Sequence, residues 1–248
     1  MSALLLRPTG MLFAVIAIAA PAGGQSFEQL TAALQPPSGA KSALSGTSFF
    51  IGKGGELLTS DHVVRDCLRI DIVSDTISQR PAQILAREDR WDLAVLRAEG
   101  DTPVPLALGE APPDDGPLRV AGYPLGGDLL RASVTPVRLA NGEINARMPG
   151  KVNAQFILVF SGAIQPGDSG APILDARGLV VGVTKGTLSD PDKIEEMFGT
   201  RFEHMLISPA PPVIAAFLGP IDPGRGGATT EQTETTIRKA IVRTLCWR

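Results

Sequence analysis

One serine stands where a nucleophile for acyl-transfer chemistry would be expected. Ser169 lies in the run Pro-Gly-Asp-Ser-Gly-Ala-Pro at residues 166–172. The flanking glycines allow a tight turn and the close approach of a substrate. The backbone N–H groups of Gly167 and Ser169 could converge on one oxygen, as an oxyanion hole requires. The same run could be an ordinary turn in a glycine-rich chain, so the chemistry depends on partners elsewhere in the sequence.

A histidine and an aspartate upstream are the candidate partners. His62 closely follows an apolar run at residues 56–59, and Asp92 directly precedes another at residues 93–96. An imidazole can take the proton of a serine hydroxyl, and a carboxylate can hold that imidazole in place. A lone histidine or aspartate is usually structural, but the order His, Asp, Ser along the chain is that of the chymotrypsin class.

These residues need a rigid frame, and the pattern of the chain predicts an all-β one. From about residue 45 to residue 183, short apolar runs alternate with turn residues, which is typical of a β-sandwich or a β-barrel. Two helices are expected after it, at residues 209–218 and, beyond a Pro/Gly-rich connector, at residues 229–245. The second prediction rests on Ile237, Ile241 and Leu245, which are spaced four residues apart.

Composition narrows the function further. The 248 residues are 44% hydrophobic and include 27 Gly and 21 Pro, which suits a turn-rich chain with a substantial core. The formal net charge of -3 offers nothing that attracts phosphate backbones, so nucleic acid is not an expected partner. Two cysteines without Cys-x-x-Cys spacing and two histidines, His62 and His204, do not predict a metal site, and no cofactor is expected.

The first residues predict export. Arg7 precedes an apolar run at residues 11–20, and small residues follow, as in a secretory signal peptide over residues 1–24. The alternative is a membrane anchor, but the run is shorter than the roughly 20 residues that span a bilayer. We therefore expect a periplasmic or secreted protein without stable membrane insertion.

The motifs, taken in order, resemble the trypsin-like serine peptidases, most closely the bacterial HtrA/Deg branch. The resembling stretches are residues 46–51, 58–64, 91–96, 121–126, 163–170, 179–186 and 202–218. The resemblance implies two six-stranded antiparallel β-barrels (about 44–125 and 126–208), the helix at 209–218, and an active site in the cleft between the barrels. The peptidase domain would cover residues 25–218, residues 219–248 would form a linker and a C-terminal helix, and the PDZ domain usual in HtrA relatives is expected to be missing.

The resemblance also implies roles for individual residues. His62 would be the general base, Asp92 its orienting carboxylate and Ser169 the nucleophile, with the N–H groups of Gly167 and Ser169 as the oxyanion hole. Polypeptide substrates would be bound as an added strand, over a specificity pocket without an acidic base. The substrate-binding positions would be Ala163, Thr184, Lys185 and Gly186.

Several features depart from the HtrA pattern and leave alternatives open. Asp61 and Asp89 are rival carboxylates to Asp92, although adjacent strand residues such as Asp61 and His62 point apart. Asp168 stands where HtrA relatives usually carry Asn; zymogen-activated relatives carry Asp there, paired with a newly formed N-terminal ammonium. The partner of Asp168 is not evident from the sequence. Two alternative functions therefore remain: a latent protease that needs activation, and a catalytically silent pseudoprotease that binds peptides.

The two cysteines could form one disulfide in an oxidising compartment. A Cys67–Cys246 bond would tie the predicted C-terminal helix to the first barrel. The alternative is two unpaired thiols.

Overall fold

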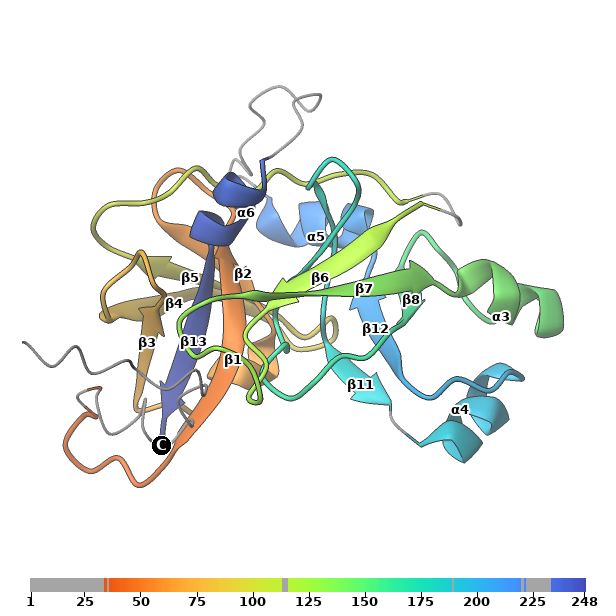
Figure 1. The fold of residues 1–248 in the computed structure, drawn as a ribbon, viewed down its shortest axis with the longest axis horizontal. Coiled ribbons are helices and arrows are strands. Elements are labelled where there is room, and N and C mark those ends of the chain that lie inside the picture. Colours follow the sequence, from red (N-terminus) through yellow and green to blue (C-terminus); the bar gives the residue numbers. More distant parts are fainter. Residues whose placement is uncertain (1–33, 35, 113–115, 189, 220, 222–232) are drawn as a thin grey trace, which may run out of the picture.

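The computed structural model describes residues 34, 36–112, 116–188, 190–219, 221 and 233–248 (Figure 1). Within these residues the chain forms thirteen strands and five helices. The predicted signal peptide, residues 1–24, lies outside the described residues. None of the helices in the described part is long and apolar enough to cross a membrane.

The first barrel is closed by six antiparallel strands in the order β1-β13-β3-β4-β5-β2. Its interior is filled by apolar side chains of several strands, among them Phe50, Leu57 and Ile72, each fully buried. The strands are β1 (Ala43–Phe50), β2 (Glu56–Thr59), β3 (Arg69–Val73), β4 (Arg80–Glu88), β5 (Leu93–Ala98) and β13 (Ile241–Trp247).

Strand β13 corrects the prediction of a helix over residues 229–245. The helix α6 spans only Glu234–Ala240, and the chain continues as β13. Ile241 and Leu245 are four residues apart, which places them on one face of a helix and equally on one face of a strand. The β-branched residues and the tryptophan of Ile-Val-Arg-Thr-Leu-Cys-Trp favour the strand, and all seven are buried. These residues therefore belong to the first barrel and are not an appended helix.

The position of β13 is what closes that barrel. It lies between two strands from the other end of the chain, paired with β1 from Ala43↔Trp247 to Phe49↔Ile241 and with β3 from Val73↔Arg243 to Arg69↔Trp247. The predicted disulfide is present: Cys67 and Cys246 are bonded, with their Cα atoms 5.2 Å apart. It joins β13, rather than a helix, to the segment that precedes β3.

The second sheet has seven strands in the order β10-β9-β6-β7-β8-β12-β11. Six of them form the second barrel of the chymotrypsin-like fold, and β11 extends the sheet at one edge. The ends of the barrel meet where the N–H of Val183 donates to Ser208 Oγ, at 2.8 Å. The strands are β6 (Leu118–Gly122), β7 (Ser133–Leu139), β8 (Ile157–Ser161), β9 (Pro172–Leu174), β10 (Val180–Val183), β11 (Gly186–Leu188) and β12 (Met205–Pro209).

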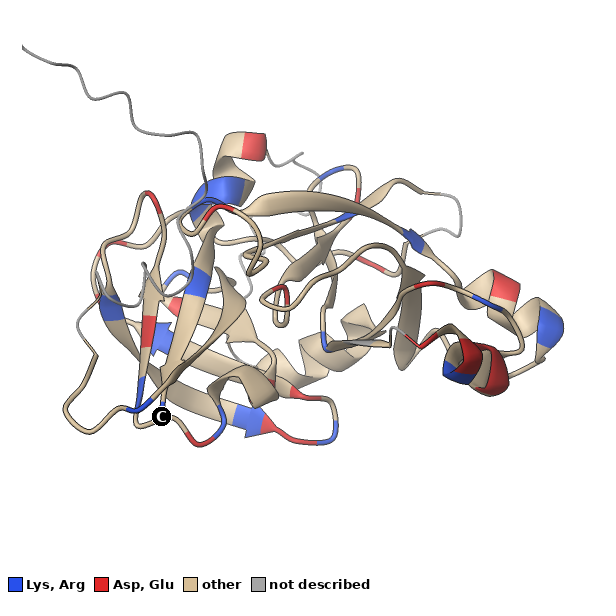
Figure 2. Cartoon of the chain, turned by 60° about the horizontal axis from the view of Figure 1, so that its bottom comes forward, with Lys and Arg blue, Asp and Glu red and all other residues tan. Residues whose placement is uncertain are grey.

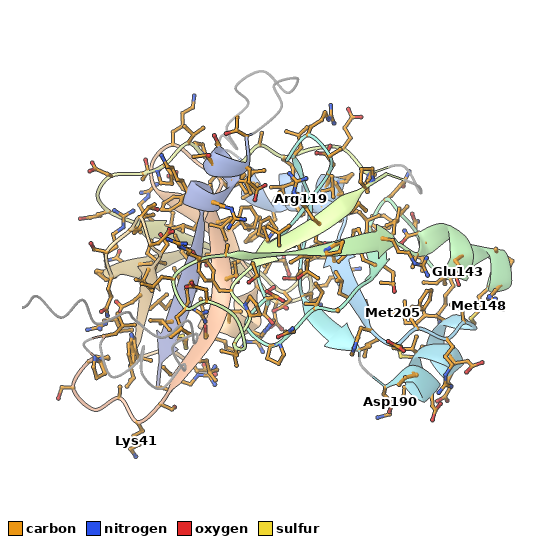
Figure 3. The ribbon with its side chains drawn as sticks, in the orientation of Figure 1. Lys41, Arg119, Glu143, Met148, Asp190 and Met205 are labelled. Atoms are coloured by element: carbon orange, nitrogen blue, oxygen red, sulfur yellow. A yellow bond between two sulfur atoms is a disulfide. The ribbon has the colours of Figure 1, made fainter. Side chains whose placement is uncertain are left out.

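The helices are short and lie on the outside of the two barrels. The helix predicted at residues 209–218 is confirmed as α5 (Pro211–Leu218); it begins two residues later because Pro209 ends β12. Helices α3 (Asn141–Arg147) and α4 (Pro191–Phe198) lie at the far end of the second sheet, around the buried Met205 (Figure 3). Figure 2 shows acidic residues gathered on α4, which carries Asp192, Glu195 and Glu196. The short α2 (Asp61–Val64) follows β2.

One apolar cluster binds the two barrels together. It joins buried residues of both sheets to α5 and α6, which Figure 1 shows along the same side of the molecule. Loops that end at this junction are held on a rigid base, which is what a precise site requires. The first barrel contributes Phe49, Leu58 and Leu93; the second contributes Ala121, Leu174 and Val180; the helices contribute Ile214, Leu218 and Ile237.

Candidate active site

His62 and Asp92 form a direct pair at the junction of the barrels. His62 Nδ1 lies 2.7 Å from Asp92 Oδ2, and the His62 backbone N–H donates to Asp92 Oδ1 at 2.9 Å. Two contacts from one carboxylate fix both the ring and the backbone of His62. The imidazole side chain is 43% exposed whereas the carboxylate is 8% exposed, so a buried acceptor holds a ring that solvent and substrate can reach.

The backbone of Asp92 is bent to make this pair. Its φ is 55°, a left-handed conformation that few residues other than glycine adopt, although Asp is among those that tolerate it. The carbonyl of Asp92 accepts the N–H of Asp61 at 3.1 Å, so the segment before β5 is bonded to the start of α2. Unfavourable backbone geometry of this kind is typical of functional sites, where the surrounding structure enforces it.

The two rival carboxylates have other partners. Asp61 is fully buried and accepts hydrogen bonds from Arg65 and Arg87, while Asp89 is paired with Arg65 on the surface. Burial raises the pKa of Asp61, but the hydrogen bonds from Arg87 and Arg65 outweigh it and hold that pKa below its ordinary value. This network anchors α2, which carries His62, and leaves Asp92 as the carboxylate that contacts the imidazole.

Ser169 lies in the loop between β8 and β9, in a turn docked on the first barrel. Its carbonyl accepts the N–H of Thr47 on β1 at 2.8 Å. Gly170 has a φ of 84°, and a Cβ atom there would collide with Thr59 and Thr47 of the first barrel. Only glycine lets the turn approach this closely, beside the residues that lead into α2. The Ser169 turn therefore packs against the first barrel just before the residues of α2 that include His62.

Within the described part of the chain, no hydrogen bond joins Ser169 Oγ to His62. The hydroxyl is half-buried and makes no hydrogen bond to another described residue. Hydrogen bonds between catalytic groups are often long without a substrate and tighten in the complex. The structure thus brings His62 and Asp92 into contact and sets the Ser169 turn beside them.

Thr184 supports the Ser169 turn from behind. It is 1% exposed; its hydroxyl donates to the carbonyl of Asp168 and accepts the N–H of Ala171 at 2.9 Å. Its own carbonyl accepts the N–H of Gly170 and the hydroxyl of Ser60, both at 2.8 Å. Thr184 was predicted to bind substrate, but its hydroxyl and its carbonyl are hydrogen-bonded to the Ser169 turn. This supporting role was not predicted from the sequence.

The oxyanion-hole candidates lie at the head of the same turn. Gly167 has a φ of 101°, and neither its N–H nor that of Ser169 donates to another described residue. The carbonyl of Gly167 is fixed by the hydroxyl of Thr47 at 2.8 Å. Asp168, between them, is 3% exposed and accepts the N–H of Gln165 at 3.0 Å. Burial raises the pKa of Asp168, opposed by that hydrogen bond and by the positive charge of Arg243.

The remaining predicted positions are reachable from solvent. Ala163 and Gly186 are exposed and Lys185 is half-buried. Gly186 opens β11, which pairs only with β12 and is the last strand of its sheet. In the described part of the chain, no strand pairs with the other edge of β11.

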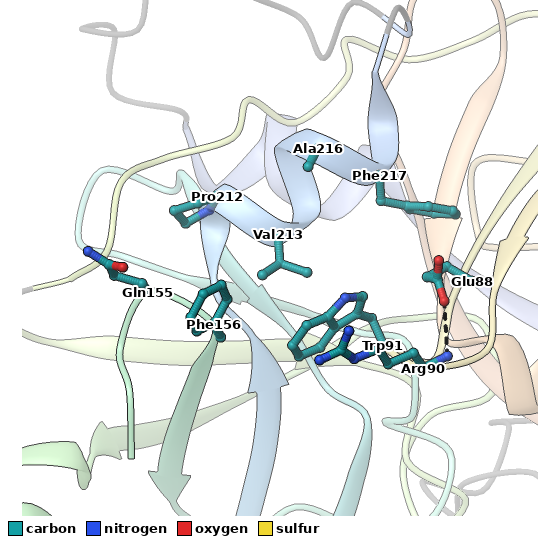
Figure 4. A pocket seen from close by; sticks show the side chains of 9 residues that line it. All are labelled: Glu88, Arg90, Trp91, Gln155, Phe156, Pro212, Val213, Ala216 and Phe217. Atoms are coloured by element: carbon teal, nitrogen blue, oxygen red, sulfur yellow. Dashed lines mark hydrogen bonds between the residues drawn. The ribbon is translucent and has the colours of Figure 1, made fainter. Parts of the chain in front are cut away.

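A separate pocket of about 510 Å³ lies next to the Asp92 segment (Figure 4). It contains none of the three predicted catalytic residues. Arg90 stacks over the ring of Trp91 with its guanidinium 5.0 Å from the ring centre, and α5 forms the facing wall. The lining residues are Glu88, Arg90, Trp91, Gln155, Phe156, Pro212, Val213, Ala216 and Phe217.

No group of three or more His, Cys, Asp or Glu side chains that could hold a metal ion occurs among the described residues.

Comparison with known proteins identifies the family. The model of the trypsin-like peptidase domain matches residues 46–183, more than half of the chain and all three predicted catalytic positions. The chain belongs to the trypsin-like peptidases. This is a family of serine proteases, and several of the similar curated proteins are of the HtrA/DegP type.

Three of these relatives are similar over about 60% of this trypsin-like peptidase. An uncharacterized protein, y4bJ, of Sinorhizobium fredii is 35% identical over 62% of this chain and 23% of its own length. A probable periplasmic serine endoprotease, DegP-like, of Chlamydia pneumoniae is 30% identical over 60% of this chain and 30% of its own. Protease Do-like 2, chloroplastic, of Arabidopsis thaliana is 32% identical over 56% and 23%. The chain spans less than a third of the length of each relative.

Solved structures show the same fold. The active form of the Rv3671c protease from M. tuberculosis has a TM-score of 0.57 and 23% identity, covering 96% of this chain and 100% of that one. The HtrA-type protease AlgW with decapeptide has a TM-score of 0.53 and 20% identity, covering 69% and 49%. Both likenesses confirm the chymotrypsin-like arrangement of this trypsin-like peptidase.

Proposed function

We propose that this chain is a serine endopeptidase that cuts polypeptides with His62 as general base, Asp92 as its orienting carboxylate and Ser169 as nucleophile. The observation that carries the proposal is the 2.7 Å contact between His62 Nδ1 and Asp92 Oδ2. This contact leaves the other ring nitrogen, Nε2, to take the proton of the serine hydroxyl. The exposed imidazole and the buried carboxylate match what each role demands.

The reaction follows from these positions. His62 removes the proton of Ser169 as the oxygen attacks the peptide carbonyl, and the N–H groups of Gly167 and Ser169 receive the negative charge on the carbonyl oxygen. The protonated imidazole, stabilised by Asp92, gives its proton to the leaving amine, and water then releases the acyl group from Ser169 by the same steps.

The substrate is held in an extended conformation. Its backbone would pair with the open edge of β11 at Gly186, and Ala163 would leave the specificity pocket without charge. Small or medium apolar side chains should be preferred before the cut bond. Substrates would be exported or misfolded proteins, in the periplasm or outside the cell. The signal-like residues 1–24, the disulfide and the printed description of the Chlamydia relative support that location.

A fluorophosphonate probe and casein digestion test the proposal. The wild type should be labelled and should digest unfolded casein, whereas Ser169→Ala should keep its fold and lose both. Ser161→Ala, which removes a half-buried hydroxyl on β8, is the matched control and should behave as wild type. Labelling of folded S169A at the wild-type rate would refute the assignment.

The latent protease is the second candidate, because Ser169 Oγ is not hydrogen-bonded to His62 among the described contacts. It would leave the wild type unlabelled until a peptide or a partner is added. A pseudoprotease would bind peptide and stay unlabelled in every condition.

A further inference from the structure

A fully buried arginine lies between the two barrels, and no carboxylate of the described residues contacts it. Arg243, on β13, is 0% exposed, and its guanidinium donates to the carbonyl of Leu129 at 2.8 Å and to Ser45 Oγ at 2.6 Å. It also stacks over the ring of Tyr123, 5.1 Å from the ring centre. Among the residues that the structure describes, Arg243 forms no ion pair. Burying a charge without a counter-charge is costly, so its counter-charge has to lie further away.

Asp168 is the buried carboxylate that lacks a cation. It accepts one backbone hydrogen bond, and no ion pair of the described residues includes it. A Cβ atom on Gly122 would lie 2.5 Å from Asp168 Oδ1, so the carboxylate packs against Gly122. The next residue, Tyr123, is the one whose ring lies under Arg243. Asp168 and Arg243, neither of which has an ion-pair partner among the described residues, therefore contact adjacent residues, Gly122 and Tyr123.

The strand register places Arg243 beside the residue that holds the Ser169 turn. Arg243 is the direct partner of Thr47 in the β1–β13 ladder, and the side chains of a directly opposed pair lie on the same face. Thr47 bonds the turn twice, through its N–H to the carbonyl of Ser169 and through its hydroxyl to the carbonyl of Gly167. Its hydroxyl also accepts the N–H of Tyr123 at 3.0 Å.

We propose that Arg243, on β13, is a positioning residue whose buried positive charge is the counter-charge of Asp168. This charge pair stabilises the turn that contains Gly167 and Ser169. This rests on the proposed peptidase function, because it concerns the oxyanion-hole donors of that site. The electrostatics agree in both directions. Burial lowers the pKa of Arg243 to about 10, and Asp168 is among the groups that oppose this fall. Tyr123 and the exposed Asp128 oppose the fall more strongly than Asp168 does, and Asp168 is the one buried carboxylate of the three groups.

A double-variant cycle on the full chain tests the pairing. Arg243→Met removes the charge and keeps the length of the side chain, and Asp168→Asn removes the carboxylate charge while keeping its shape. Loss of one oxyanion-hole donor costs about 10²–10³ in kcat, so we expect R243M to lower kcat by about 10²-fold, with KM for a peptide substrate changed less than about twofold. Adding D168N to R243M should recover about tenfold of that loss, because no unpaired carboxylate then remains.

The control is Arg138→Met. Arg138 stacks over the ring of Phe202 at the same distance, 5.1 Å, but it is an exposed residue on β7, far along the second sheet from Asp168. R138M should keep wild-type kcat, and D168N should have the same effect in R138M as in the wild type. An Arg243 that served only through its hydrogen bonds to Leu129 and Ser45 would not be rescued by D168N.

Each outcome decides one of the two proposals. A folded R243M with wild-type kcat, or an R243M/D168N no more active than R243M, overturns the pairing and leaves the peptidase function standing. If R243M does not fold, recovery of a cooperative melt in R243M/D168N supports the pairing, and continued failure overturns it. A wild type that neither cleaves nor labels overturns the proposed function. In that case thermal unfolding alone tests the pairing. The change in Tm caused by D168N should be more favourable in the R243M background than in the wild type by at least about 2 °C.

Discussion

Opening the Cys67–Cys246 disulfide should remove a large part of the stability of the fold. The bond joins residues 179 positions apart, and the chain-entropy model gives about 5 kcal/mol at 25 °C for a loop of that length. Measured values commonly fall below this, at about 2–4 kcal/mol, so we expect a loss of about 2–4 kcal/mol. Domains are stable by only about 5–15 kcal/mol in total, which would leave the reduced protein marginal.

Denaturation in urea with and without reductant measures this loss. Trp247 reports directly on β13, because it is 3% exposed and its indole N–H donates to Asp71 Oδ2 at 2.7 Å. A Trp91→Phe background makes its fluorescence the only tryptophan signal, since the chain has two Trp. The transition midpoint should fall on reduction and in a Cys67→Ala/Cys246→Ala variant to a similar extent.

The variant without cysteines is also the control for the reductant. Its midpoint should not respond to reductant, because it has no bond to open. If mass spectrometry shows the wild-type bond fully reduced and the midpoint is nevertheless unchanged, the reasoning from loop closure is refuted for this protein.

Three further changes probe the site and its supports. Asp92→Asn should lower kcat by about 10⁴ with little effect on binding, since the imidazole loses the group that sets its tautomer, while Asp89→Asn, measured in the same peptidase assay, should stay near wild type. Asp61→Asn should cost about 1–3 kcal/mol at neutral pH through the loss of its charged hydrogen bonds. Because the folded-state pKa of Asp61 is lowered, the difference from wild type should be complete above about pH 4, its unfolded pKa, and should be lost as the pH falls through the lower folded-state pKa. Equal destabilisation at acid and neutral pH in urea titrations would contradict this. Thr184→Val should destabilise the chain by about 0.5–1.5 kcal/mol, because the Asp168 carbonyl and the Ala171 N–H lose their bonds to the Thr184 hydroxyl and keep the bond to each other. It should also slow fluorophosphonate labelling. Unchanged labelling would show that the Thr184 hydroxyl does not position the Ser169 turn.

The sequence was sufficient for the chymotrypsin-like fold and for most of the strands, and it indicated which residues to propose as catalytic. His62, Asp92 and Ser169 lie in local patterns whose order along the chain predicts the chemistry, and the strands of both barrels are short apolar runs bounded by turn residues. The disulfide could be predicted because the chain has only two cysteines and the first residues indicate export.

Two features could not be predicted because they depend on contacts distant in sequence. The apolar spacing of Ile241 and Leu245 fits a helix and a strand equally well. The segment forms a strand because it pairs with the edges of both β1 and β3, which are distant in the sequence. The counter-charge that we propose for Asp168 could not be predicted for the same reason. Arg243 lies 75 positions further along the chain, and nothing in its local sequence indicates that it is buried.

The order of the strands has a consequence for how the protein is made. A ribosome releases β1 and β3 well before β13, the strand that lies between them in the barrel. Until then both strands have unpaired edges, which are sites for mispairing with other chains. At about 5–20 residues per second, the roughly 170 residues between β3 and β13 keep the first barrel open for some ten seconds or more. A nascent chain that has not yet reached β13 lacks both the closed barrel and Arg243, so the first barrel can close only after β13 has been synthesised.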